Sequence, residues 1–215
     1  MPASPPEDVF SLLAKLAPQP GALLLVLVGP NGAGKSTFYK RRLAAIPLQF
    51  VNADVLAQTL IQAGAPAGEA TERLAAELAE KKRQELVAKG ESFITETVFS
   101  DPVGAKVQKL REAQAAGYTV VLIFLCVDSA ELAVLRVESR VQNGGHNVPA
   151  DKIASRYDRM RGNVKSALAF VDFAIVVDNS SFETPLRPVA ATARGKVIHR
   201  SPQLPWWADK VLPKE

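Results

Sequence analysis

The chain has 215 residues but only one cysteine, and it has no apolar stretch long enough to cross a bilayer. Cys126 therefore has no partner for an internal disulfide, which favours a reducing compartment. Its place inside the apolar run 120–127 predicts a small core side chain. Residues 1–6 are proline-rich and uncharged, unlike a signal peptide. These absences predict a cytoplasmic protein with no membrane partner.

Aromatic residues are also scarce, at 7% of the chain, and they are not interleaved with the arginines. Lys and Arg number 26 against 22 Asp and Glu, a net charge of +4, and the arginines concentrate between residues 136 and 161. A surface for single-stranded nucleic acid combines a long basic groove with stacking aromatics. The composition therefore argues against a nucleic-acid partner, and a compact basic cluster suits phosphate groups.

Two signatures of common nucleotide-hydrolysing proteins are missing as well. The chain has no Leu-Ser-Gly-Gly sequence, which transporter-type ATPases need, and no Asn-Lys-x-Asp sequence, with which GTPases bind guanine. Both absences count against a motor or a switch.

What is present is a phosphate-binding loop, Gly-Pro-Asn-Gly-Ala-Gly-Lys-Ser at residues 29–36. Glycines permit close approach to a ligand, and successive N–H groups form a concave anion site. Lys35 is expected to reach the outer phosphates of ATP, and Ser36 to bind Mg²⁺. An apolar strand at 23–28 and a helix at 37–45 flank the loop in the order that the motif requires. Nucleotide contacts are therefore predicted for Gly29, Pro30, Asn31, Gly32, Ala33, Gly34, Lys35, Ser36 and Thr37.

Strands and helices alternate along the chain, which predicts an α/β fold. We expect a three-layer P-loop NTPase fold with a mainly parallel five-stranded sheet and a helical lid. The other strands are expected at 48–52, 93–97, 118–127 and 173–177. With 47% hydrophobic residues, the chain suits a single domain, 1–215. Its predicted parts are a core at about 21–180, a lid at about 136–163, and a C-terminal hairpin and tail at about 186–215.

Several local features complete this prediction. An amphipathic helix is expected at 7–17, and a longer one at 69–88 with Leu74, Leu78 and nearby alanines at helical spacing. Asp128 follows an apolar strand and imitates the second acidic motif of NTPases, but with Glu131 it also fits a helix capping box. Trp206 and Trp207 are expected to pin the tail onto the core.

Two acidic residues follow or end predicted strands and are the candidates for chemistry. Asp54 comes directly after the second strand, and ligands collect beyond the carboxyl ends of parallel strands. Its carboxylate could accept the proton of a substrate hydroxyl, or it could cap the following helix. Glu96 lies at the end of an apolar strand, where a carboxylate is costly unless a cation is near. It could hold Mg²⁺ or substrate, or form an ion pair with an arginine.

The predicted lid carries pairs of arginines on helical faces. Arg136 and Arg140 are four residues apart, and Arg156 and Arg159 are three apart on the next helix. A glycine-rich loop, with His146 at its tip, separates the pairs. Such arginines could bind phosphate and close the site against water, or they could form a solvated basic face. We expect Arg136 and Arg140 to contact the nucleotide, and Arg140 and Arg156 to take part in catalysis.

Taken together, these motifs resemble the zeta-toxin-like P-loop kinases, a group that includes proteins labelled predicted ABC-type ATPases. The resemblance covers about residues 23–179. It rests on the phosphate loop, the Val-Asn-Ala-Asp step at 51–54, Glu96-Thr97, Arg140, and the segment from Gly144-Gly145-His146-Asn147-Val148-Pro149 to Arg156-Tyr157.

The resemblance implies a kinase with ATP and Mg²⁺ as cofactors. Zeta toxins phosphorylate a hydroxyl on the sugar of UDP-N-acetylglucosamine, so Asp54 corresponds to the carboxylate that activates the acceptor and Glu96 to a second site acid. Lys35 and Ser36 match the nucleotide motif. Paired toxins of that group bind an antitoxin, whereas this chain resembles the free-standing branch more closely. The competing hypotheses are a P-loop ATPase without a phosphorylated small-molecule product and a kinase acting on nucleic-acid ends.

Overall fold

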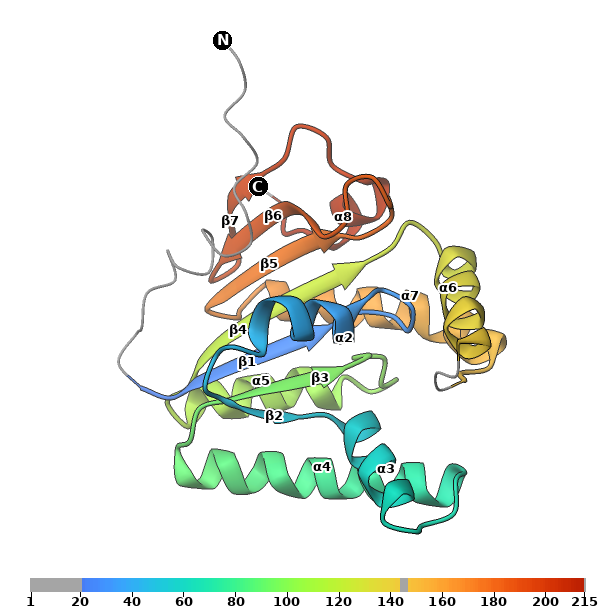
Figure 1. Cartoon of the computed structure of the whole chain (residues 1–215). Helices are drawn as coiled ribbons and strands as arrows, with labels where there is room; N and C mark the ends of the chain where they lie inside the picture. The colour runs from blue at the N-terminus through green and yellow to red at the C-terminus, as the bar shows by residue number, and fades with distance from the viewer. Residues whose placement is uncertain (1–20, 144–146, 215) are drawn as a thin grey trace.

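The computed structural model describes residues 21–143 and 147–214 of the chain, and the helix expected at 7–17 lies outside them. A sheet of seven strands in the order β2-β3-β1-β4-β5-β6-β7 forms the centre of the fold (Figure 1). The strands are β1 (Leu23–Val28), β2 (Gln49–Val51), β3 (Phe93–Thr97), β4 (Thr119–Cys126), β5 (Phe173–Asp178), β6 (Arg187–Ala193) and β7 (Lys196–Arg200). The helices are α2 (Lys35–Phe38), the π-helix η1 (Tyr39–Leu43), α3 (Ala53–Gln62), α4 (Glu69–Lys89), α5 (Ala105–Ala115), α6 (Ala130–Gln142), α7 (Ala150–Leu168) and α8 (Trp206–Val211).

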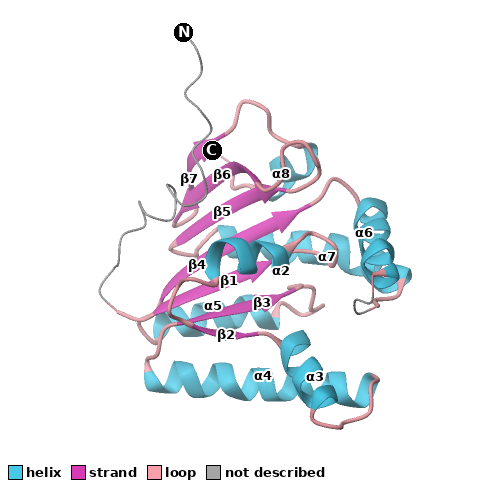
Figure 2. Ribbon diagram, in the orientation of Figure 1, coloured by secondary structure: helices cyan, strands magenta, loops and turns pink. Residues whose placement is uncertain are grey.

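The first five strands are parallel, as the sequence predicts. Leu27 of β1 pairs with Glu96 of β3 on one side and with Ile123 of β4 on the other. Figure 2 shows α2 on the front of this sheet and α5 and α7 behind it, which gives the expected three layers. Burial of β1 and β4 by these layers explains why both strands are continuous apolar runs.

The sheet has two strands more than the predicted five, because the C-terminal hairpin joins it. β6 pairs antiparallel with β5, and β7 pairs antiparallel with β6. Arg194 and Gly195 at the turn have φ angles of 46° and 79°, the sign that tight hairpin turns require. A hairpin is a local pattern that sequence can predict, whereas its pairing with β5 is a contact between distant segments.

Neither residue considered as a helix cap fills that position: not Asp54, for which a cap was the alternative to chemistry, and not Asp128. Asn52, not Asp54, caps α3: its Oδ1 accepts hydrogen bonds from the Asp54 and Val55 N–H groups at 2.7 and 3.3 Å. Ser129, not Asp128, caps α6, with its Oγ accepting from Leu132 N–H at 3.2 Å. Each actual cap has extended backbone angles, from which a short polar side chain reaches the first helical turn.

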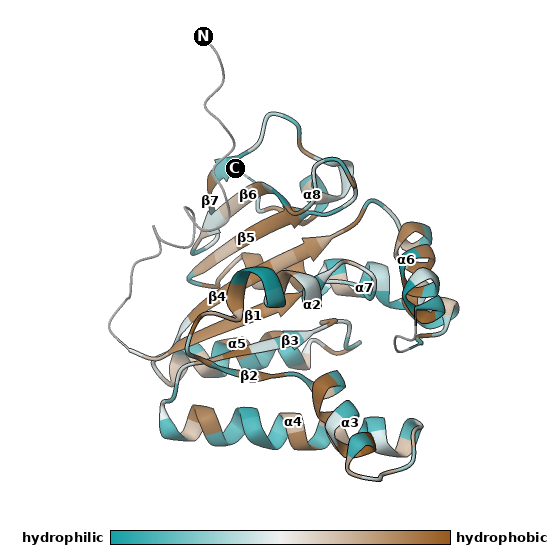
Figure 3. Cartoon of the chain, in the orientation of Figure 1, coloured by the Kyte–Doolittle hydropathy of each residue, from teal (hydrophilic) through white to brown (hydrophobic). Residues whose placement is uncertain are grey.

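The face of α4 that packs on the fold contains the alanines of the expected stripe but not its two leucines. Leu74 and Leu78 are 46% and 39% exposed, whereas the buried side chains include the small Ala75 and Ala79. Figure 3 shows polar and apolar residues alternating along α4, whereas β1 and β4 are mostly apolar. Helical spacing identifies a stripe of residues, but small residues can mark the buried face where helices approach closely.

The remaining outcomes concern the first helix and the tail. The expected helix 37–45 is divided into the short α2 and η1, and Tyr39 of η1 stacks on Phe50 at a centroid distance of 3.6 Å. In the tail, Trp207 is fully buried, and its ring packs edge-on against Phe124 with 5.5 Å between the ring centroids, as expected for a residue that anchors the tail. Trp206, by contrast, is 47% exposed. In the part of the chain that the structure describes, no helix is both long and apolar enough to span a membrane.

Candidate active site

The phosphate loop lies at the carboxyl end of β1 and is held from two sides. Gly34 has a φ of 90°, and a Cβ atom there would stand 2.6 Å from the amide nitrogen of Asn179. A Cβ on Gly32 would stand 2.4 Å from the carbonyl oxygen of Ala133, at the start of α6. The glycines therefore allow the loop to pack against both the β5–β6 connection and α6, which a side chain would prevent.

Lys35 is the buried cation of the site, with 7% of its side chain exposed. Its ammonium donates a hydrogen bond to the Pro30 carbonyl at 3.0 Å and lies 3.8 Å from Glu96 Oε1. Burial lowers the pKa of Lys35, and the nearby carboxylates of Glu96 and Asp54 oppose that shift. The lysine is thus folded over its own loop, next to an acid.

Glu96 receives hydrogen bonds from two neighbouring segments. Asn52 donates through its amide nitrogen at 2.9 Å, and Ser36 through its hydroxyl at 3.5 Å, both to Oε2. Burial raises the pKa of Glu96, while Lys35 and these hydrogen bonds partly offset the shift, as a buried carboxylate next to a cation should behave. Sequence reasoning left open an ion pair with an arginine, but the cation that faces Glu96 is Lys35.

Asp54 is presented by the first turn of α3, at the carboxyl end of β2. Its side chain is exposed, so a ligand can reach it. Its negative charge lies close enough to oppose the burial that lowers the pKa of Lys35 and to add to the burial that raises the pKa of Glu96. Since Asn52 caps the helix, capping no longer accounts for Asp54, which leaves its carboxylate available for chemistry.

Asn179 joins the loop to the opposite side of the site. Its amide nitrogen donates to the Ala33 carbonyl at 2.8 Å, and its amide oxygen accepts from Leu186 N–H at 3.0 Å. Its own carbonyl accepts from Arg136 at 2.6 Å. Asn179 thereby connects the phosphate loop, the β5–β6 connection and α6.

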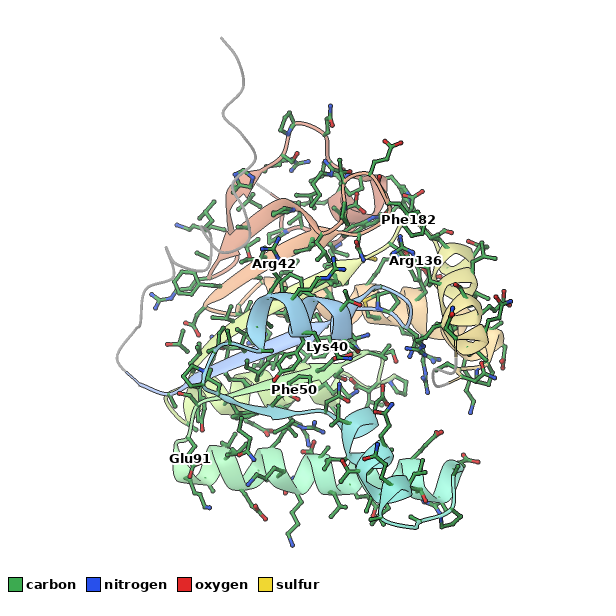
Figure 4. The ribbon with its side chains drawn as sticks, viewed as in Figure 1. Lys40, Arg42, Phe50, Glu91, Arg136 and Phe182 are labelled. Carbon is green, nitrogen blue, oxygen red and sulfur yellow. The ribbon has the colours of Figure 1, made fainter. Side chains whose placement is uncertain are left out.

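Arg136 and Phe182 meet beside this connection, as Figure 4 shows. The guanidinium carbon lies 5.0 Å from the ring centroid, and the ring itself is 83% exposed. Arg136 also donates to the Ser180 carbonyl at 3.2 Å, while its Nε is buried without a partner among the described residues. The predicted phosphate contact of Arg136 therefore stays a prediction, because two of its three nitrogens bond backbone carbonyls of the β5–β6 connection.

The other lid arginines are placed on α6 and α7. Arg140 is exposed near the end of α6 and acts on the pKa of Lys35, which it lowers. Arg156 is half-buried on α7, beside Tyr157, whose hydroxyl donates to the Val127 carbonyl at the end of β4. The loop tip with Gly144, Gly145 and His146 lies outside the described residues.

The structure thus brings Lys35, Ser36, Asp54 and Glu96 together at the ends of β1, β2 and β3. Sequence reasoning missed Asn52 and Asn179 as residues that organise the site. Asn52 directly follows β2 and Asn179 directly follows β5, and Asp54 was predicted from a similar place after a strand. The same rule, a polar residue at the carboxyl end of a strand, could therefore have identified both asparagines. Their roles depend on which side-chain atom meets which segment, and a linear pattern does not contain that information.

The side-chain oxygens at the site fit the ligand preferences of Mg²⁺. Across residues 21–143 and 147–214 there is no cluster of three or more His, Cys, Asp or Glu that could hold a metal by itself. Mg²⁺ commonly uses one or two protein oxygens together with waters and substrate phosphates. The adjacent oxygens of Ser36 and Glu96 match that requirement.

Comparison with known proteins shows the family to which the chain belongs. A family model described as an AAA domain matches residues 24–166, more than half of the chain. The chain belongs to the AAA domain family. A comparison with curated proteins finds no match to it.

Solved structures with a fold similar to that of this chain include a toxin–antitoxin system, a complex with ATP and a proposed kinase. The PezAT chromosomal toxin–antitoxin system of Streptococcus pneumoniae aligns with a TM-score of 0.57 and 15% identity, over 95% of this chain and 85% of that one. The AvrRxo1-ORF1:ORF2 complex with ATP has a TM-score of 0.62 and 14% identity, over 94% and 67%. A proposed kinase from Chloroflexus aurantiacus j-10-fl has a TM-score of 0.53 and 17% identity, over 76% and 91%. The expected resemblance to zeta-toxin-like P-loop kinases is confirmed for the fold, and this fold implies nucleotide binding.

Proposed function

We propose that the protein is an ATP-dependent kinase that transfers the γ-phosphate to a hydroxyl of a small molecule. One observation carries this proposal. Asn52 bonds Glu96 through its amide nitrogen and caps the helix that presents Asp54 through its amide oxygen. One side chain therefore joins Glu96, which faces the phosphate loop, to the first turn of the helix that carries Asp54, and a kinase needs an acid near its acceptor as well as a phosphate cradle.

In the proposed reaction, Asp54 accepts the proton of the acceptor hydroxyl. The hydroxyl oxygen forms a bond to the γ-phosphorus as the bond from that phosphorus to the bridging oxygen of ADP breaks. Lys35 exchanges its bond to the Pro30 carbonyl for phosphate oxygens and stabilises the charge on the transferring group. The exposed position of Asp54, beside a buried lysine, supports these roles.

Magnesium belongs to the same proposal. Ser36 and Glu96 would hold the ion together with phosphate oxygens. The ion supplies charge neutralisation for the phosphates when it is bound. Glu96 must be ionised for that task, and the hydrogen bond from Asn52 favours its ionised form.

The base of the nucleotide is proposed to stack on Phe182. This ring is exposed, lies over Arg136, and follows Asn179, which contacts the phosphate loop. Aromatic rings provide stacking surfaces for nucleobases. Arg140 and Arg156 are proposed to complete the site from the lid helices and to exclude water.

The acceptor that the zeta-toxin resemblance implies is a nucleotide sugar such as UDP-N-acetylglucosamine. A radiolabel-transfer assay with γ-labelled ATP and Mg²⁺, this sugar nucleotide and a panel of other hydroxyl-bearing metabolites tests the proposal. Asp54→Ala should retain ATP binding and lose transfer by about 10²–10⁴-fold, the range for general-base catalysis. Asp128→Ala is the matched control, because Asp128 is also exposed after a strand but is not among the groups that bond Lys35 or Glu96 or act on their pKa values.

Label that moves to one acceptor with the wild type and the control, but not with Asp54→Ala, supports the kinase. Label released only as free phosphate, at equal rates in all three proteins, contradicts the proposal and favours an ATPase. An antitoxin remains a prediction of the resemblance, and its test is co-purification of a specific partner with the tagged full chain.

A further inference from the structure

A cavity lies on the face of the sheet opposite Glu96, between α4, α5 and the strands β1 and β3. Its volume is about 350 Å³. Thr95 and Thr97 face it from β3, while Glu96 between them points to the phosphate loop. The walls are mainly apolar and are formed by Leu24, Val26, Val87, Phe93, Leu110 and Ala113.

A cation stands at the wall of this apolar cavity. The Lys106 ammonium donates a hydrogen bond to the neutral Thr97 hydroxyl at 2.6 Å. It forms no ion pair within the described part of the chain, and burial lowers its pKa, with Asp101 as the acid that opposes the shift. Burying an ammonium group is costly unless an anion compensates it, and a lysine that only filled space could be a methionine.

A second cation is only partly neutralised. Arg83 donates to Glu80 Oε2 at 3.0 and 3.1 Å and to Thr95 Oγ1 at 3.3 Å. Glu80 also pairs with Lys109, so one carboxylate serves two cations at the cavity mouth. The charge next to the apolar walls is therefore positive on balance, even when Glu112 at the rim is included.

The segment that closes the cavity is strained. Phe99 lines it with a φ of 62°, a conformation that bulky side chains rarely adopt. Asn163 of α7 holds this segment by donating to the carbonyls of Phe99 and Asp101 at 3.0 and 2.9 Å. Strain of this kind persists where surrounding contacts impose it and is frequent at ligand sites.

We propose that this cavity is a second binding site, for an amphipathic anion whose apolar body lies along β1, β3 and α5 and whose acidic group bonds Lys106 and Arg83. The volume is in the range of small-ligand pockets, which combine apolar walls with a few polar groups. The site does not depend on the kinase proposal, because its contacts require no phosphate-loop residue, although Lys106 lies near enough to Lys35 and Arg156 for both charges to lower its pKa further.

The test uses the full chain without nucleotide, so its result is separable from any failure of phosphoryl transfer. The probe is 11-(dansylamino)undecanoic acid, followed by its fluorescence, with its methyl ester as the uncharged comparison. Lys106→Met keeps the apolar stem and should weaken binding of the acid about tenfold or more. Ala88→Trp, on the exposed part of α4 at the cavity, should block both probes. Lys165→Met is the matched control, since this exposed lysine of α7 does not line the cavity, and it should change the affinity less than threefold.

Tight binding of the acid that depends on Lys106, is lost in Ala88→Trp and is not shared by the ester supports the proposal. Equal affinities of the wild type and Lys106→Met for the acid would overturn it, because the cavity would then be apolar only. Binding that survives Ala88→Trp would overturn it too, because the probe would occupy another surface. Far-ultraviolet circular dichroism of each variant verifies that it is folded.

Discussion

On one side of Lys35 the site is acidic and is joined by hydrogen bonds between short side chains, whereas on the other side it is basic and built from long side chains on helices. On the acidic side, Asn52 bonds Glu96 at 2.9 Å and the N–H of Asp54 at 2.7 Å. On the basic side, Arg136 holds the β5–β6 connection, and Arg140 and Arg156 extend from α6 and α7.

The difference concerns how firmly each side is positioned before a ligand arrives. Residues at strand ends have short side chains and a backbone held by the sheet, so their polar atoms have few alternatives. Arginines on helices carry many rotatable bonds, and ordering them costs conformational entropy. We infer that the acidic side is preorganised for chemistry and that the basic side adjusts to the nucleotide.

Lys35→Ala removes the cation between the two sides and should have the greatest effect. We expect ATP binding to weaken severely and transfer to fall by at least about 10²–10³-fold, the loss typical of one preorganised charge-stabilising group. Isothermal titration and the transfer assay measure the two effects. Lys40→Ala, at an exposed lysine one turn further on, is the control (Figure 4). Unchanged ATP affinity in Lys35→Ala would refute the phosphate-loop assignment.

Asn52 tests preorganisation of the acidic side. Asn52→Ala loses the helix cap, at a cost of about 1 kcal/mol in the free energy of unfolding. It also loses the bond that favours ionised Glu96, so the pKa of Glu96 should rise further. Protonation inactivates Glu96 as pH falls, and the acid limb of the pH–rate profile should therefore move to higher pH. Asn52→Asp separates the two effects, because it keeps the cap oxygen but replaces the donor with a second negative charge beside Glu96. An acid limb at the same pH in all three proteins would contradict this role.

Phe182 tests the basic side. Phe182→Ala should weaken ATP binding by about 1–3 kcal/mol, the usual contribution of base stacking, which is roughly a 5- to 150-fold rise in Kd. Tripolyphosphate, which has no base, should bind both proteins equally. Competition against a fluorescent ATP analogue measures both affinities. Equal losses for the two ligands would mean that the change disturbs the phosphate loop rather than a base site.

Cys126 lies beneath both sides, fully buried at the end of β4, and should respond least. Burial raises the pKa of its thiol to about 12, so the thiolate is scarce at any ordinary pH. We expect no alkylation by iodoacetamide at pH 8 in the native protein, and full alkylation in denaturant, as followed by mass spectrometry. Rapid alkylation of the native protein would show that the two sides of the site separate in solution.

The acidic side was also the more predictable one. Asp54 and Glu96 were expected near the loop because they lie at the ends of apolar strands, and parallel strands bring their carboxyl ends to one edge. The arginines were expected on shared helical faces, but spacing along a helix does not set its rotation. Arg136 consequently turns out to be bonded to Asn179 and Ser180.

The sequence by itself determined the parallel strands, the phosphate loop and most helices, because each depends on local periodicity or on glycines in a short motif. Only the tertiary structure decided that the hairpin extends the sheet, that Asn52 bonds Glu96, and that Lys106 faces an apolar cavity. These features join segments tens of residues apart. The free energy that selects such contacts comes from packing and burial in three dimensions, which no linear pattern records.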